Sequence, residues 1–215
     1  MKRFFKDMVD VVDPLDSRYS WLRLFITLCV SALGNVGVWA IVIIMPAVET
    51  EFDIERNTVS LLYTVTMLGF GLGNFILGRL VDRHGIFFVL TFSAVIISSG
   101  FFLITFTSSI LVFCILQFFI GVGTSASFGP LIADVSHWFK KNRGIAVAIV
   151  ASGNYLSGAI WPLLLSGVLS DTGWRSVYLY LSFLTIVGIV SLAFFLKSKS
   201  VATLNVNDPF DEELN

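Results

Sequence analysis

Long stretches without Asp, Glu, Lys or Arg dominate this chain. Five such runs extend over Leu24–Val48, Asn57–Gly78, Gly85–Ala133, Gly144–Ser170 and Ser176–Leu196. A helix needs roughly 20 apolar residues to cross the hydrocarbon core of a bilayer. Four runs are therefore long enough for one span each, and the third holds two, divided by the polar tract Thr105, Thr107, Ser108 and Ser109. We predict an all-α membrane protein whose six transmembrane helices cover residues 22–48, 58–79, 86–105, 110–135, 144–169 and 175–196.

The composition agrees with a chain surrounded by membrane lipid. Hydrophobic residues make up 56% and charged residues 13%, against about 25% charged residues in soluble domains. The net charge of -1 leaves no basic face for a nucleic-acid partner. The first apolar run exceeds the 7 to 15 residues of a signal-peptide core, so we expect a retained anchor. A segment of residues 1–21 precedes the predicted bundle of residues 22–196, and a polar tail of residues 197–215 follows it.

Positive charges are distributed unequally between the two sides of the predicted bundle. Only Arg56 and Arg175 fall on one side, where the first loop is acidic; the other side holds Lys2, Arg3, Lys6, Arg18, Arg23, Arg79, Arg83, Lys140, Lys141, Arg143, Lys197 and Lys199. Because loops rich in Lys and Arg stay in the cytoplasm, we predict that both termini are cytoplasmic. An even number of spans requires the same arrangement.

Small residues and prolines inside the spans indicate how the helices pack. The second span contains Gly69, Gly71, Gly73 and Gly78, and the fourth contains Gly121, Ser125 and Gly129. Small residues at such spacing allow helix backbones to approach closely in lipid, so we expect a packed bundle. Pro130 and Pro162 are expected to bend the fourth and fifth helices.

The loop after the second span reads Gly78-Arg79-Leu80-Val81-Asp82-Arg83-His84-Gly85. It resembles the cytoplasmic signature of the major facilitator superfamily, G-x-x-x-D-R-x-G followed by two basic residues, although Ile86 and Phe87 replace the basic pair. We expect Gly78 and Gly85 to permit a tight crossing of antiparallel helices. The resemblance implies that Asp82 latches the two halves of a transporter in its outward-facing state.

A second stretch is similar to the monocarboxylate and oxalate/formate antiporter-like bacterial branch of this superfamily. The similar segments are residues 128–134, 138–146 and 151–154, together with Gly173-Trp174-Arg175 before the sixth span. Asp134 lies near the cytoplasmic end of the fourth helix, where we expect a network with Arg83 or Arg143. The predicted cytoplasmic gate motif therefore contains Gly78, Asp82, Arg83, Gly85, Asp134 and Arg143.

The chain departs from the drug exporters of the superfamily at one motif. Their R-x-x-Q-G sequence is matched here by Gln117, Ile120 and Gly121, without the arginine. No span centre contains an acidic residue, so no proton carrier is visible in the membrane. These features weaken a drug-proton antiport interpretation.

Neutral polar residues are left as candidates for a substrate site. They are Asn35 and Trp39 in the first helix, Gln117, Thr124 and Ser125 in the fourth, and Asn154, Ser157 and Trp161 in the fifth. Residues three, four and seven positions apart share a helix face, so each set forms a stripe. The stripes either line a midplane cavity or form hydrogen bonds that hold the bundle together.

The resemblance implies a secondary active transporter that works by alternating access in the bacterial inner (plasma) membrane. The expected cargo is a small solute, such as the monocarboxylates or other organic anions. Since the superfamily has twelve helices, we expect this chain to be an amino-terminal half. Its partner would be a carboxy-terminal half, from the same gene or a separate one, or a second copy.

Other functional classes fit the sequence less well. The spans lack His, acidic pairs and the H-E-x-x-H or G-x-S-x-G patterns, so we expect no enzyme, no metal site and no cofactor. A non-transporting membrane scaffold would explain the glycines but not the loop motif. An oligomeric channel stays open as an alternative.

Overall fold

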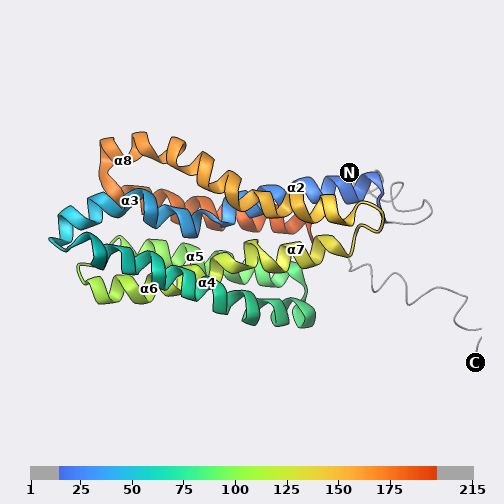
Figure 1. The fold of residues 1–215 in the computed structure, drawn as a ribbon, viewed down its shortest axis with the longest axis horizontal. Helices are drawn as coiled ribbons and strands as arrows, with labels where there is room; N and C mark the ends of the chain where they lie inside the picture. Colours follow the sequence, from blue (N-terminus) through green and yellow to red (C-terminus); the bar gives the residue numbers. More distant parts are fainter. Residues whose placement is uncertain (1–14, 198–215) are drawn as a thin grey trace, which may run out of the picture.

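The computed structural model describes residues 15–197, and all regular structure in this part is helical (Figure 1). The predicted segments 1–21 and 197–215 lie largely outside the described residues. The elements in chain order are α2 (Arg18–Gly34), α3 (Val36–Phe52), α4 (Arg56–His84), α5 (Ile86–Ile104), α6 (Ile110–Thr124), the short 3₁₀ helix η1 (Ser125–Ser127), α7 (Gly129–Ser136) and α8 (Arg143–Phe195).

Within the described residues, five helical stretches are long and apolar enough to cross a membrane, where the sequence predicts six. Two are composite, because α2 continues into α3 and α6 continues through η1 into α7. The difference in number arises in the 53-residue α8, which contains both the fifth and the sixth predicted spans. Gly173 interrupts α8 with φ 79° and ψ 170°, and the chain reverses its direction there (Figure 1).

The helices lie along one common axis, and the described chain begins and ends at the same end of the bundle (Figure 1). The α4 helix packs mainly along α6, while α2 and α5 pack against α8. A Cβ atom on Gly69 would lie 2.2 Å from the Phe118 carbonyl oxygen, and one on Gly121 would lie 2.1 Å from that of Thr66. Helix backbones therefore approach closely at these small residues, as expected of a packed bundle; the pairing of the second predicted helix with the fourth was not specified by the sequence.

Two interruptions lie side by side in the interior. Asn35 separates α2 from α3, and its Nδ2 donates to the Ser31 carbonyl at 2.8 Å and to the Ser127 carbonyl at 3.3 Å. Asn side chains compete with the helical backbone for such carbonyls. Phe128, with φ -127° and ψ -86°, separates η1 from α7, and Pro130 occupies the first turn of α7. Pro130 thus begins a new helix segment, which is a stronger disturbance than the predicted bend, whereas Pro162 lies inside α8.

Large apolar side chains cover much of the outside of the bundle. Phe75 on α4 and Leu163 on α8 are 63% and 79% exposed, and Phe25, Phe119, Phe183 and Phe194 are at least half exposed. An apolar surface of this extent is stable against lipid tails and unfavourable in water. The structure therefore agrees with the prediction of a multi-pass membrane protein.

Candidate functional site

The predicted gate motif ends α4 and begins α5. Gly85 adopts φ 80° and ψ 163°, and its N–H donates to the Val81 carbonyl at 2.8 Å, which closes the end of α4. This positive φ is a conformation that glycine adopts without steric cost. Asp82 and Arg83 are exposed, and neither has an ion-pair or hydrogen-bond partner for its side chain within residues 15–197. Their charges are therefore available to groups outside the described part of the chain.

The expected tight crossing at Gly78 and Gly85 is wrong for this bundle. A Cβ atom placed on either residue would meet no other atom within 4 Å. Gly85 is explained by its backbone conformation alone. Gly78 faces open space on α4, so no contact among the described residues requires glycine there.

Asp134 does not pair with Arg83 or Arg143, in contrast to the sequence prediction. Its Oδ2 accepts from Nη2 of Arg23 at 2.9 Å and from Nε at 3.3 Å. The exposed fractions of the two side chains are 3% for Arg23 and 17% for Asp134, so this ion pair lies in the interior. Arg143 instead donates to the Ser136 hydroxyl at 3.3 Å. The α2 helix places Arg23 directly against α7, which explains the difference.

Asp16 connects the start of the described chain to the loop between α7 and α8. Its carboxylate accepts from the backbone N–H groups of Lys140, Lys141 and Asn142 at 2.8 to 3.1 Å. These donors, that of Lys141 first, hold the pKa of the Asp16 carboxyl below its ordinary value of 3.8. The loop with Lys140 and Lys141 is thereby fixed to the beginning of α2.

The polar stripes of the first and fifth predicted helices meet each other. Nε1 of Trp39 donates to the carbonyl of Asn154 at 3.0 Å and to its Oδ1 at 3.2 Å. About two turns further along α8, Nε1 of Trp161 donates to the Ala32 carbonyl of α2 at 3.0 Å. Trp39 and Asn154 are partly exposed, whereas Trp161 is buried. These contacts bind the composite helix α2–α3 to α8 on both sides of the interruption at Asn35.

The remaining stripe residues are buried within the bundle. Asn35, Gln117, Thr124, Ser125 and Ser157 are all inaccessible to solvent in the described part of the chain. Ser125 donates to the Val122 carbonyl at 2.7 Å, and Thr124 packs against Gly37. Gln117 lies beside the Tyr178 hydroxyl, but neither side chain makes a well-formed hydrogen bond within residues 15–197. A cavity role of these residues stays a prediction, and the structure places only Trp39 and Asn154 at a partly open surface.

A cluster at the opposite end of the bundle was not predicted as a unit. Glu51, at the end of α3, accepts from the Trp174 indole and pairs with Arg175. Arg175 also donates to the carbonyls of Thr105 and Thr107 at 3.1 and 3.2 Å. One arginine therefore connects three segments of the chain. The sequence signal was present, because the charge pattern puts Glu51 and Arg175 on the same side of the membrane.

The arrangement offers hydrogen-bond donors and charges but no metal site in its described part. No group of three or more His, Cys, Asp and Glu side chains among residues 15–197 is placed to hold a metal ion.

Comparison with solved structures supports the fold described above. The chain is similar to a bacterial homologue of the human lysosomal transporter Spinster, solved in an inward-facing and unoccupied conformation. The TM-score is 0.68 at 16% identity, and the match covers 85% of this chain and 44% of that structure.

Relatives with known names match most of this chain. It is 24% identical to monocarboxylate transporter 6 of Mus musculus, over 96% of this chain and 44% of the relative. It is 22% identical to the 4-hydroxybenzoate transporter of Acinetobacter baylyi, over 84% of this chain and 40% of the relative. The chain thus spans less than half the length of these relatives.

The loop motif, the helical fold and the relatives all point to one family. The relatives and the structural neighbour named above are transporters. The model of the Major Facilitator Superfamily matches residues 24–212, and the chain therefore belongs to this family of transporters.

Proposed function

We propose that the chain forms the amino-terminal six-helix half of an alternating-access secondary transporter. Division of α8 at Gly173 leaves helical segments of residues 143–172 and 174–195. At 1.5 Å per residue these segments are roughly 45 and 33 Å long, and each exceeds the hydrocarbon thickness of about 30 Å. The chain matches less than half of the length of each named relative, which supports a two-half arrangement. The partner is a carboxy-terminal half or, as a second possibility, another copy of this chain.

The proposed cargo is a small organic anion, and the Trp39–Asn154 pair carries this proposal. Asn154 uses its oxygen atoms to accept from the Trp39 indole, while its amide nitrogen makes no hydrogen bond within residues 15–197. A neutral N–H donor at a partly open surface suits a carboxylate oxygen. Both named relatives transport carboxylic acids or their anions by name. The charge of the anion would be balanced by a cationic residue of the other half.

Transport measurements test this proposal. Proteoliposomes that contain only monomers of the 215-residue chain should not accumulate radiolabelled lactate or 4-hydroxybenzoate, whereas those with the complete two-half protein should. In the complete protein, Asn154→Ala should reduce uptake at least about tenfold, since a donor to the bound anion is worth about 1.5 kcal/mol or more. Tyr155→Ala is the matched control, because Tyr155 is 74% exposed on the same helix. Uptake by monomers of the 215-residue chain alone would overturn the two-half proposal.

The proposed orientation has both termini in the cytoplasm of a bacterial cell, with the protein in the inner membrane. The gate turn, the Lys140 loop and the described chain ends lie at one end of the bundle (Figure 1), which supports this orientation. Cysteine labelling tests it after Cys29 and Cys114 are replaced by serine. His84→Cys and Lys140→Cys should react from the inside, and Asn57→Cys from the outside. Opposite sides for His84→Cys and Lys140→Cys would contradict the topology.

A further inference from the structure

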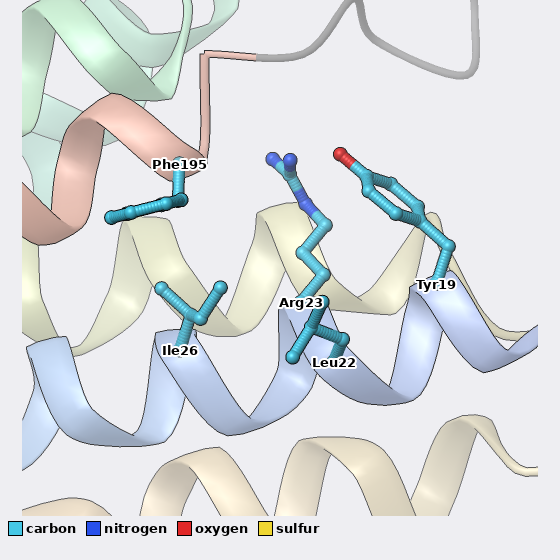
Figure 2. Close-up of a pocket in the computed structure, with 5 residues that line it drawn as sticks. All are labelled: Tyr19, Leu22, Arg23, Ile26 and Phe195. Carbon is cyan, nitrogen blue, oxygen red and sulfur yellow. The ribbon is translucent and has the colours of Figure 1, made fainter. Parts of the chain in front are cut away.

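A pocket lies between the beginning of α2 and the end of α8. It has a volume of about 150 Å³ and is lined by Tyr19, Leu22, Arg23, Ile26 and Phe195. Figure 2 shows the side chains of Tyr19 and Arg23 extending from α2 in the same direction, with Phe195 on the neighbouring end of α8. The pocket belongs to the end of the bundle at which the described chain begins and ends. The transport proposal makes no use of it.

The floor of the pocket is hydrocarbon and opens to the outside of the bundle. Leu22 and Phe195 are 43% and 59% exposed, and Ile26, one turn along α2 from Leu22, lies next to Phe195 (Figure 2). The adjacent Phe25 is also exposed. In a membrane protein these surfaces face lipid, so the floor suits an acyl chain better than a polar solute.

The rim of the pocket is polar. The Tyr19 hydroxyl makes no hydrogen bond within residues 15–197. Arg23 has five N–H groups; two donate to Asp134 and one donates to the Leu196 carbonyl at 3.2 Å. Two N–H groups of a buried guanidinium, together with a phenolic O–H, therefore remain to donate to an acceptor at the rim.

The chain next to this pocket carries more positive than negative side chains: Arg18 precedes Tyr19 and Lys197 lies two residues after Phe195, whereas Asp16 lies two residues before Arg18. Asp134 balances Arg23, but Arg18 and Lys197 have no acidic partner among the described residues. The Lys197 ammonium lies 5.2 and 5.6 Å from the ring centroids of Phe87 and Phe194, so it sits at the end of α8 near α5 and its charge acts on the pocket from outside the lining. An occupant that matches both surfaces has an anionic head and a hydrocarbon tail.

We propose that this pocket binds one anionic phospholipid, with its phosphate at Tyr19 and Arg23 and an acyl chain over Leu22, Ile26 and Phe195. Basic pockets between helices near a membrane surface bind lipid head groups of this charge. A soluble anion would use the rim alone, and a zwitterionic lipid would gain little from Arg18 and Lys197. The proposal needs only a membrane-embedded chain and does not depend on the cargo.

Native mass spectrometry of the purified 215-residue chain tests the floor of the site. Phosphatidylglycerol should bind at least fivefold more tightly than phosphatidylcholine with the same acyl chains. Ile26→Trp, which fills the pocket, should weaken phosphatidylglycerol binding about tenfold. Leu163→Trp is the matched control, because this exposed residue of α8 lies outside the pocket. Unchanged binding to Ile26→Trp, in protein with an unaltered thermal midpoint, would overturn the proposal.

The rim is tested by charge variants that leave the Arg23–Asp134 pair intact. Arg18→Gln and Lys197→Gln should each weaken phosphatidylglycerol binding roughly fivefold, as expected for one basic residue at a membrane surface, and leave phosphatidylcholine unaffected. Arg56→Gln, at the opposite end of the bundle, should change neither lipid. Equal affinity for the two lipids would refute the charge argument. Displacement of the lipid by millimolar inorganic phosphate would identify a soluble-anion site and also overturn the proposal.

Discussion

The two ends of the bundle use their charged residues differently. At one end, Arg175 pairs with Glu51 and donates to the carbonyls of Thr105 and Thr107, so three connecting segments are tied together. At the other end, Arg23 and Asp134 form an interior pair, but the neighbouring Asp82 and Arg83 have no side-chain partner within the described residues. The difference separates charges that stabilise this bundle from charges that remain available to something outside it.

This contrast is compatible with the latch role that the family resemblance implies for Asp82, which stays a prediction. A carboxylate that is exposed and unpaired contributes little to the stability of its own bundle. Asp82 can therefore form and lose a contact with another half without a large folding cost. Charges already engaged in the interior, such as Arg23, lack this freedom.

The largest loss of stability is expected at the interior pair. Arg23→Met leaves the mostly buried Asp134 carboxylate without its cation, which should cost about 3 kcal/mol. The measurement is the thermal unfolding midpoint in detergent. Arg83→Met is the control and should change stability by less than about 0.5 kcal/mol. Because removal of both charges restores a neutral interior, Arg23→Met with Asp134→Leu should recover part of the loss. Equal midpoints for the two single variants would contradict the comparison.

A smaller loss of stability is expected at the end of the bundle that contains Glu51 and Arg175. Glu51→Ala removes the partner of Arg175 and the acceptor of the buried Trp174 indole. The ion pair is 37% and 41% exposed, so we expect about 1 to 2 kcal/mol in total. Glu49→Ala is a suitable control, because Glu49 has no side-chain partner within residues 15–197. Protease sensitivity of the loop at Thr105 should rise only in Glu51→Ala; an unchanged loop would show that the connection is dispensable.

The contact of Asp16 predicts a dependence on pH. Its folded-state pKa is lowered by the backbone N–H groups of Lys141, Lys140 and Asn142, so its stabilising effect is complete above the unfolded-state value of 3.8. The effect is lost as the pH falls below 3.8 and through the lower folded-state pKa. Wild type should therefore have a slightly higher thermal midpoint than Asp16→Asn at pH 7, and the gap should narrow as the pH falls below 3.8. A gap of constant size from pH 7 down to pH 3 would exclude the carboxylate as its cause.

The smallest change in stability is expected at Asp82. Asp82→Asn should leave the thermal midpoint unchanged, because the side chain has no partner among residues 15–197. In the complete transporter it should nevertheless reduce uptake severalfold at equal surface abundance. Asp53→Asn makes the same chemical change at the opposite end, where residue 53 has φ 49°, a conformation that asparagine tolerates. Normal uptake kinetics in Asp82→Asn would remove the latch hypothesis.

The spans were predictable because lipid imposes a simple requirement on the sequence. Predicted starts at residues 86 and 110 coincide with the observed Ile86 and Ile110. The first helical stretch is longer than predicted, Arg18–Phe52 rather than 22–48, since charged residues near membrane surfaces also adopt helical structure. The interruptions at Asn35 and Phe128 were not predicted, because the Asn35–Ser127 hydrogen bond joins residues far apart in the sequence.

The candidate site was less predictable than the spans. The sequence predicted that Asp134 pairs with a cationic side chain, but it pointed to Arg83 or Arg143, which are nearer to Asp134 in the chain than Arg23 is. The correct partner depends on the packing of α2 against α7, which no local pattern specifies. The Trp39–Asn154 pair was predicted only as two separate stripes, since the relative rotation of α3 and α8 decides which faces meet.

The glycines of α4 differ in how strongly packing restricts their replacement during evolution. At Gly69 and Gly73 a methyl group would collide with the backbone of the adjacent helix, so any larger residue at these positions would disrupt the packing of the two helices. At Gly71 and Gly78 a methyl group would meet nothing, and packing within the bundle permits replacement there. If distant homologues also have glycine at these two positions, the cause is a contact with a surface outside the described bundle that requires the absence of a side chain there.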